Sequence, residues 1–200
     1  MPEAYPARLV VMALELEGQG AFERAGVPVL YTGLGKVNAA LVLAARLAGY
    51  RAAARPLPLV LNFGSAGSRC FATASLVACE RFVQRDMDVS GLGFALGVTP
   101  FEAEGAELAF PQVFADLPRG VCGTGDSFET GPPRLACDVV DMEAYALAKA
   151  CRRAGAAFGC AKYITDGADH AAAADWQANL EHAAAAFVRL YATVPAPAAV

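Results

Sequence analysis

The arrangement of apolar and polar positions along the chain predicts strands that alternate with helices. Several short apolar runs contain β-branched residues and are bounded by Gly, Pro or polar residues, which is typical of strands buried on both faces. Longer stretches carry apolar residues at helical spacing, and two of them stop at a glycine. Strands are predicted at residues 8–14, 27–33, 58–64, 74–83, 119–125, 137–142 and 157–165. Helices are predicted at residues 36–49, 143–155 and 172–194.

This alternation indicates an α/β fold with a central mixed, mainly parallel sheet flanked by helices. The small residues at 65–68 are predicted to form a loop, and residues 86–118, rich in Gly, Pro and Phe, a longer irregular segment. A chain of 200 residues is long enough for one domain with a sizeable core and short for two. We therefore expect one domain over residues 1–194 and a flexible tail over residues 195–200.

The composition narrows the classes of function. The chain is 56% hydrophobic and 18% charged, which indicates a compact globular protein and argues against disorder. Its formal net charge is −4 and its Lys and Arg residues are scattered, whereas nucleic-acid binding requires a basic face. The apolar runs are too short to span a bilayer, and residues 1–17 do not resemble a signal peptide. We therefore expect a cytoplasmic protein that binds neither nucleic acid nor membranes.

The six cysteines are expected to be reduced thiols in a cytoplasmic core. They form no CxxC pair, and most lie in apolar surroundings. Their spacing offers no clustered zinc ligands, and the chain has two histidines. We therefore expect neither a metal ion nor a cofactor. The cysteines are Cys70, Cys79, Cys122, Cys137, Cys151 and Cys160.

Ligands of open α/β sheets bind beyond the carboxyl ends of the strands, so the residues that follow each predicted strand are the candidates for a site. Acids and small residues dominate this set. Its members are Glu15 and Glu17, residues 33–36, residues 64–68, residues 125–128, Met142 and Glu143, and Thr165 and Asp166.

Each acid in this set also has an ordinary structural explanation. Glu15 and Glu17 suit the first turn of a helix, where carboxylates interact favourably with the helix dipole. Glu143 lies at the predicted start of a helix, where capping is the usual role of an acid. Asp166 could cap the last helix, and Asp169 is a better candidate for that cap.

Two glycine-containing segments are equally open to interpretation. The segment GLGKVNAA (33–40) resembles a turn that holds a phosphate, but it lacks the full P-loop spacing and is more typical of a tight strand-to-helix turn. The segment NFGSAGS (62–68) requires glycines either for a sharp turn or for a close approach of the backbone to a ligand.

Five motifs taken together resemble the purine nucleoside phosphorylase and nucleosidase superfamily. The likeness is greatest to the 5′-methylthioadenosine/S-adenosylhomocysteine nucleosidases and is least over residues 101–118 and the two termini. It implies a single-domain phosphorylase/nucleosidase-like fold and an enzyme that cleaves the N-glycosidic bond of a purine nucleoside. The motifs are GLGKVNAA, NFGSAGS, GTGDSFE (123–129), VVDMEAYALA (139–148) and YITDGADH (163–170).

The resemblance implies a catalytic role for two carboxyl groups. Asp166 corresponds to the acid that protonates the purine at N7, which lets the base leave as a neutral molecule and is typically worth a factor of about 10²–10⁴. Such an acid must keep its proton near neutral pH, so burial is expected to raise its pKa. Glu17 corresponds to the base that orients and deprotonates the attacking water, with Glu15 as the fallback. One acid and one base on either side of a glycosidic bond is the arrangement of an inverting hydrolase.

The resemblance also implies the residues that bind the substrate. Glu143 corresponds to the residue that accepts hydrogen bonds from the ribose hydroxyls, and Met142 to the methionine packed on the sugar. Phe128 corresponds to the aromatic residue stacked on the purine, whose edge the backbone of Phe128 or Glu129 would contact. Where the family places an arginine near the attacking water, this chain has Lys162, which lacks the planar fork of arginine. The resemblance further implies that Ser65, Ala66 and Gly67 border the base and the sugar, and that Thr165 also belongs to the substrate site.

Residues 86–100 resemble the segment through which subunits of the family contact each other. The resemblance implies a homodimer in which Leu92, Phe94 and Pro100 lie near the 5′ group of the nucleoside bound by the neighbouring subunit. Ordinary loop anchors would show the same pattern of apolar residues. Leu92 replaces an aromatic residue of the family and leaves more room for the 5′ group.

Three functions stay open at this point. The first is hydrolysis of methylthioadenosine, S-adenosylhomocysteine or a related nucleoside, including inosine or futalosine. The second is phosphorolysis, which requires cations around an oxyanion; Arg69 and Lys36 are the candidates for that role, whereas the first loop offers Glu15 and Glu17 instead. The third is a nucleoside-binding protein without turnover, against which the presence of Asp166, Glu143 and Glu17 argues.

Overall fold

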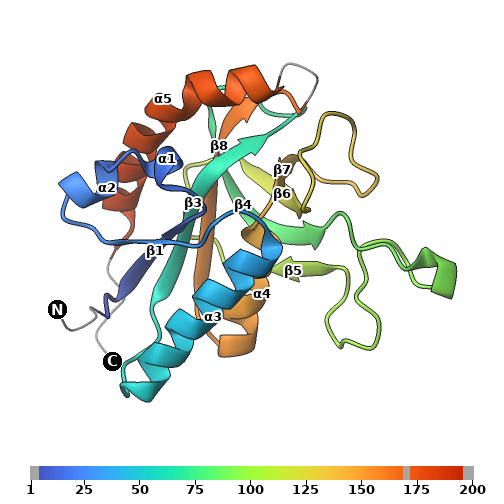
Figure 1. The fold of residues 1–200 in the computed structure, drawn as a ribbon, viewed down its shortest axis with the longest axis horizontal. Helices are drawn as coiled ribbons and strands as arrows, with labels where there is room; N and C mark the ends of the chain where they lie inside the picture. The colour runs from blue at the N-terminus through green and yellow to red at the C-terminus, as the bar shows by residue number, and fades with distance from the viewer. Residues whose placement is uncertain (1–4, 169–171, 196–200) are drawn as a thin grey trace.

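The structure, a computed structural model, describes residues 5–168 and 172–195. Over these residues the chain alternates strands and helices (Figure 1). The strands are β1 (Arg8–Met12), β2 (Val29–Tyr31), β3 (Leu59–Gly67), β4 (Leu76–Gln84), β5 (Glu107–Ala109), β6 (Arg119–Thr124), β7 (Val139–Asp141) and β8 (Phe158–Asp166). The helices are α1 (Glu15–Gly18), α2 (Ala21–Arg24), α3 (Lys36–Ala52), α4 (Ala144–Ala154) and α5 (Ala172–Thr193), with a 3-10 turn η1 (Ser90–Leu92).

The strands of the described residues form one mixed sheet. β1 pairs in parallel with β2 and β3, β3 with β8, β4 with β6, and β6 with β7. β4 runs antiparallel to β5 and to β8. One antiparallel pair, Gly67 with Val140, joins the end of β3 to β7, so that the ends of β3, β7 and β8 lie together. The predicted fold class, a mixed and mainly parallel sheet with helices on both faces, is confirmed.

Helices cover the two faces of this sheet, as Figure 1 shows. α3 and α4 pack against each other on one face, where their buried side chains meet those of β3, β4 and β8. α5 crosses the other face together with α1 and α2, over a core that contains stacked aromatic rings such as Phe22 and Phe63. β8 lies in the middle and is buried along its whole length, which explains why its sequence is a nearly continuous apolar run.

Several elements differ from the sequence-based expectation. β3 does not end at residue 64 but continues to Gly67, because β8 pairs with it through Ser65 and Ala66. The small residues that suggested a loop are therefore strand residues beside the site. The short α1, α2 and β5 were not predicted, since four-residue helices and a three-residue edge strand carry too little periodic signal.

The cysteines are free thiols, as expected, but they are not all in the core. Cys79, Cys122, Cys151 and Cys160 are buried, whereas Cys70 is exposed. Within residues 5–168 and 172–195, none of the helices is both long and apolar enough to cross a membrane. The capping role considered for Asp169 lies outside the described residues, as does the proposed tail beyond residue 195.

Candidate active site

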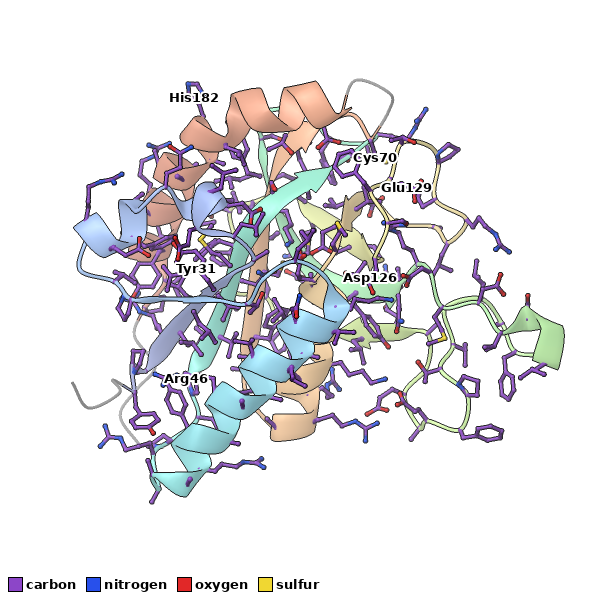
Figure 2. The ribbon with its side chains drawn as sticks, in the orientation of Figure 1. Tyr31, Arg46, Cys70, Asp126, Glu129 and His182 are labelled. Carbon is purple, nitrogen blue, oxygen red and sulfur yellow. The ribbon has the colours of Figure 1, made fainter. Side chains whose placement is uncertain are left out.

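A cavity of about 230 Å³ opens where the ends of β3, β7 and β8 meet the segment that follows β6. This is the place at which an α/β sheet is expected to bind a ligand. The loop after β6 borders the cavity. Figure 2 shows Glu129 and Asp126 in this loop, beyond the end of β6. The lining residues are Ala13, Leu14, Glu17, Leu34, Ser65, Ala66, Gly67, Arg85, Ser127, Phe128, Glu129, Val140, Asp141, Met142, Glu143 and Asp166.

Asp166, the predicted acid, is the last residue of β8 and is 3% exposed. The register of β3 and β8 shifts between Ala66 and Gly67, so that Thr165 is an additional residue on β8 and Asp166 lies opposite Gly67. Such a bulge redirects a side chain at a strand end. The Thr165 hydroxyl donates to Asp166 Oδ2 at 2.9 Å, and the backbone N–H of Ala168 donates to Oδ1 at 2.9 Å. These bonds fix the orientation of the carboxyl group on the cavity.

Gly67 is the reason that Asp166 can approach the backbone of β3. A Cβ atom at position 67 would lie 2.5 Å from Asp166 Oδ1 and 3.2 Å from Val140 Cγ2. Both distances leave no room for even a methyl group without a shift of the neighbours. The second glycine of NFGSAGS is therefore required for close packing against the acid, a reason that differs from both alternatives considered from the sequence, a sharp turn and a close approach to a ligand.

Glu17, the predicted base, lies in α1 and is 5% exposed. Its Oε1 accepts hydrogen bonds from the Ser65 backbone N–H at 2.8 Å and from the Ser65 hydroxyl at 2.6 Å. Its Oε2 accepts a bond from the Leu14 N–H at 3.3 Å. Glu15, two residues earlier, is exposed and does not line the cavity as the described residues define it. The burial and bonding of Glu17 exceed what a solvated helix start would give.

Glu143, the predicted ligand of the sugar, is buried on the same cavity. Its Oε1 accepts a hydrogen bond of 2.8 Å from the backbone N–H of Gly35. Gly35 precedes α3 with φ of 91°, a conformation that favours glycine, so the GLGK segment is a tight turn that presents this N–H. Burial, together with the negative charge of Asp141, raises the pKa of Glu143 to about 8.

Lys162 lies behind the cavity, fully buried on β8. Its ammonium forms an ion pair of 2.8 Å with Asp141 Oδ2. Burial by itself would raise the pKa of Asp141, but Lys162 and the hydrogen bonds from Thr124 and Ala144 hold that pKa below its usual value. The ammonium also lies 3.3 Å from the position that a Cβ of residue 64 would take, and Glu17 Oε1 lies 3.4 Å from the same point. Lys162 thus places a positive charge close to Glu17.

The side of the cavity that the loop after β6 forms carries an ion pair that the sequence did not suggest. Arg85 Nη1 lies 2.7 Å from Glu129 Oε2 and 3.0 Å from the Ser127 hydroxyl. Phe128, between them in sequence, is 53% exposed and lines the cavity. Met142 lines it as well, so the residues proposed for the base and the sugar lie on one cavity.

The residues proposed for the 5′ group lie elsewhere. Leu92, Phe94 and Pro100 belong to the long segment between β4 and β5, which extends away from the sheet in Figure 1. Within the part of the chain that the structure describes, they do not line the cavity.

The two candidate phosphate ligands are engaged with other groups. Lys36 Nζ lies 2.6 Å from Asp86 Oδ1 and 3.7 Å from Asp126 Oδ2. Arg69 donates to the Ala168 carbonyl at 3.5 Å. Among the described residues neither side chain lines the cavity.

Sequence reasoning missed Arg85 and Asp141. Arg85 comes directly after β4, two residues beyond the predicted end of that strand, and it was missed because the candidate set contains no residue that follows the strand predicted at 74–83. Asp141 is the last residue of β7, just before Met142, and its role depends on Lys162, which is distant in sequence. Within residues 5–168 and 172–195, the His, Cys, Asp and Glu side chains form no group of three that could hold a metal ion.

Comparisons with known proteins agree with this geometry. A relative from Marinomonas sp. (strain MWYL1), a 5′-methylthioadenosine/S-adenosylhomocysteine nucleosidase, is 31% identical over 170 residues, which cover 74% of this chain and 71% of the relative. The nucleosidase of that name from Helicobacter pylori has the same fold, with a TM-score of 0.79 at 19% identity, over 96% of this chain and 100% of its own. The futalosine hydrolase of Helicobacter pylori strain 26695 gives a TM-score of 0.80 at 22% identity, over 94% of this chain and 97% of its own.

The family model of the phosphorylase superfamily matches residues 19–194, a range that begins within the α1–α2 region and ends just after α5. The matched range contains all of the residues that line the cavity except Ala13 and Leu14, which follow β1, and Glu17 in α1. Because the model spans nearly the whole domain and the site lies within the expected sheet, the chain belongs to the phosphorylase superfamily.

Proposed function

We propose that the protein hydrolyses the N-glycosidic bond of a purine nucleoside and releases the free base and the sugar. The observation that carries this proposal is the presence of two buried carboxyl groups, Asp166 and Glu17, on one cavity. Glu143 lies on the same cavity and can accept hydrogen bonds from sugar hydroxyls. The name of the Marinomonas relative makes methylthioadenosine and S-adenosylhomocysteine the first candidates for the substrate.

In this proposal each carboxyl group performs one step. Asp166 gives its proton to N7 of the purine as the bond to the sugar breaks, so that the base leaves uncharged. Glu17 takes a proton from the attacking water, while Ser65 keeps the carboxylate in place. The negative charge of Glu143 would stabilise the positive charge that develops on the sugar. The protein thereby divides acid and base catalysis between the end of β8 and the helix α1.

Hydrolysis is favoured over phosphorolysis by the charges around the cavity. Phosphate needs several cations or free N–H groups, and Lys36 is held by Asp86 while the N–H of Gly35 is held by Glu143. An assay of base release with and without phosphate decides between the reactions. Equal rates and free sugar as product are expected, whereas a strict need for phosphate with formation of a sugar 1-phosphate would overturn hydrolysis.

We further propose that the active form is a homodimer built through residues 86–100. Leu92 is 76% exposed, and Phe94 packs edge-on against Phe101, which is itself exposed, with ring centroids 5.6 Å apart. Exposed apolar residues gathered in one segment are typical of an interface between proteins. A two-fold dimer would bury the segment and close the sugar side of the cavity.

The six free thiols support a reducing compartment, the cytoplasm.

Phe94→Asp is expected to weaken dimerisation and activity together, because a carboxylate without a partner is costly to bury in an interface. Sedimentation and turnover measured on the same sample test this, with Asp116→Asn, on an exposed surface residue, as the control. A wild-type protein that is fully active as a monomer at low concentration would disprove the link between assembly and activity.

The affinity for a nucleoside is expected to increase with pH between 6 and 8.5. Below its pKa of about 8, Glu143 is mostly protonated and loses part of its capacity to accept bonds from the sugar diol. A ligand that binds the ionised form must displace that proton, so its dissociation constant should fall at least about tenfold as pH rises through this window. Calorimetry on Asp166→Asn, which avoids turnover, measures the constant.

The matched controls for this pH effect are Glu143→Gln and a 2′,3′-dideoxynucleoside. Both remove the contact between a titrating carboxyl group and the diol, so both should bind with little pH dependence. If the dissociation constant of the ligand with the diol does not change with pH in the protein that retains Glu143, then this residue does not bind the sugar in its ionised form.

A further inference from the structure

Arg85 is a buried cation on the wall of the cavity to which neither acid catalysis nor sugar binding gives a role. It comes directly after β4, and its backbone N–H donates to the Thr124 carbonyl at 2.9 Å. Thr124 is the last residue of β6, so this bond holds Arg85 beside the segment that follows β6. The side chain of Arg85 is 5% exposed and lines the cavity. A guanidinium is always charged, so its burial requires acceptors.

The acceptors of this guanidinium belong to one short segment, residues 125–129. Nη1 lies 2.7 Å from Glu129 Oε2 and donates to the Ser127 hydroxyl at 3.0 Å. Nη2 donates to the carbonyl of Gly125 at 3.4 Å and to the carbonyl of Ser127. The buried Nε–H has no partner among the described residues. Within this part of the chain, the side chain of Arg85 therefore bonds the segment 125–129 and nothing else.

The segment is shaped to receive a guanidinium. A Cβ atom at Gly125 would lie 2.8 Å from Arg85 Cζ and 3.0 Å from Nη1, so a side chain at that position would displace the arginine. The planar fork of arginine bonds several acceptors at once, whereas the ammonium of a lysine is a point charge. Asp126 is secured separately, because its N–H donates to Asp86 Oδ2 at 2.9 Å.

Phe128 is the residue whose place this arrangement controls. Its side chain is 53% exposed and lines the cavity, so the backbone on either side does more to fix the ring than packing does. On one side, Ser127 bonds Arg85 through both its hydroxyl and its carbonyl. On the other side, Glu129 forms the ion pair with Arg85. A loop that is ordered in advance loses less conformational entropy when a ligand binds, and its ligand binds more tightly.

We propose that Arg85 is a positioning residue for the nucleoside, because through Ser127 and Glu129 it holds Phe128 in the place from which the ring contacts the bound base. The inference rests on the proposed hydrolysis of a purine nucleoside and adds a residue that acts on binding. The hydrogen bonds of Arg85 end on the segment 125–129 and not on the proposed acid or base. Its loss should therefore raise KM and leave kcat nearly unchanged.

Arg85→Met removes all four of these hydrogen bonds and keeps a side chain of similar shape. KM for methylthioadenosine should rise about 5- to 100-fold, the range that a lost stack between a base and an aromatic ring gives. The kcat value should stay within about threefold of wild type. Arg85→Lys keeps the charge and can pair with Glu129 but lacks the fork, so its KM should lie between those of Arg85→Met and wild type.

Arg81→Met is the matched control. Arg81 forms an ion pair of 2.6 Å with Glu107, on the pairing of β4 with β5, and does not line the cavity of the described residues. Its KM should stay within about twofold of wild type. Thermal unfolding curves show whether each variant is folded, and the conservative Arg85→Lys serves if Arg85→Met is not.

A double-mutant cycle separates positioning from a general structural role. Phe128→Ala should raise KM by a factor similar to that of Arg85→Met. In the double variant KM should rise by no more than about threefold beyond the Phe128→Ala value, because an arginine that acts through Phe128 then has no ring left to position. Independent roles of the two residues would give factors that multiply, and that result would overturn the inference.

Hydrogen exchange provides a readout that does not need turnover. The peptide that contains residues 125–129 should exchange its amide protons faster in Arg85→Met than in wild type or Arg81→Met. An unchanged exchange rate, an unchanged KM, or a loss confined to kcat would each show that the inference is wrong, and the nucleosidase would stand. If the wild-type protein releases no base from methylthioadenosine or inosine, with or without phosphate, the proposed function itself fails. The exchange rates then decide alone whether Arg85 orders the segment.

Discussion

Asp166→Asn is expected to lower kcat by a factor of about 10²–10⁴ while leaving substrate affinity within a few-fold of the wild-type value. An amide cannot deliver a proton to N7, yet it keeps the size of the carboxyl group. With its oxygen toward the Ala168 N–H, its NH₂ group can donate to the Thr165 hydroxyl, which then turns its own hydrogen toward the Ala66 carbonyl, 3.3 Å away. The effect should therefore appear in kcat and not in KM.

Steady-state kinetics and calorimetry on the same preparation measure the two quantities, with Asp116→Asn on the surface as the control. Normal turnover by Asp166→Asn would place the acid elsewhere. The next residues to examine would be Glu129, on the same cavity, and Asp169, which lies outside the described residues.

Glu17→Gln is expected to reduce hydrolysis by a similar factor, about 10²–10⁴, because a neutral amide does not take a proton from water. Glu17 is also the acceptor of both donors of Ser65, so the amide must keep its oxygen toward Ser65 and turn its NH₂ group toward the Leu14 N–H. The donor–donor contact with Leu14 should cost some stability, which a thermal unfolding curve would record separately.

Glu15→Gln is the matched control for this substitution, since Glu15 lies in the same helix but is exposed. Its turnover should stay within about twofold of wild type, as expected for a surface substitution away from the site. If Glu15→Gln were the more damaging of the two, the base would be Glu15 and the proposed alignment of the first loop with the family would be wrong.

The parts of the site that follow strands could be predicted from the sequence. Asp166 and Met142 each come directly after, or at the end of, an apolar run, and such strand ends are where α/β sheets bind ligands. The two ends meet through β3, with which β8 pairs in parallel and β7 antiparallel. The sequence could not show that a bulge at Thr165 sets Asp166 beside Gly67, because a shift of register depends on the partner strand. The extension of β3 through Ser65 could not be predicted either, because it also depends on the pairing with β8.

Ion pairs between residues that are far apart in the chain could not be predicted from the sequence. Lys162 could be noted as a lysine in an arginine position, but its ion pair with Asp141 joins β7 to β8, which follow one another in the chain and are each paired with other strands in the sheet. Arg85 and Glu129 are 44 residues apart, and neither β4 nor the loop after β6 has a pattern that points to the other. The direction of the pKa shift of Glu143 likewise depends on burial and on Asp141, which become known together with the fold.

The pairing of β3 with β8 has a consequence for the order in which the protein acquires its activity. The pair joins Val60 to Phe158 and Gly67 to Asp166, so its two strands are far apart in sequence and close late in folding. Asp166 lies at the far end of β8, beyond α4, and its neighbour Gly67 cannot complete the site before that strand is in place. Catalysis should therefore appear in refolding experiments with the slowest phase of the native fluorescence or later, because a chain with the first seven strands ordered still lacks its acid.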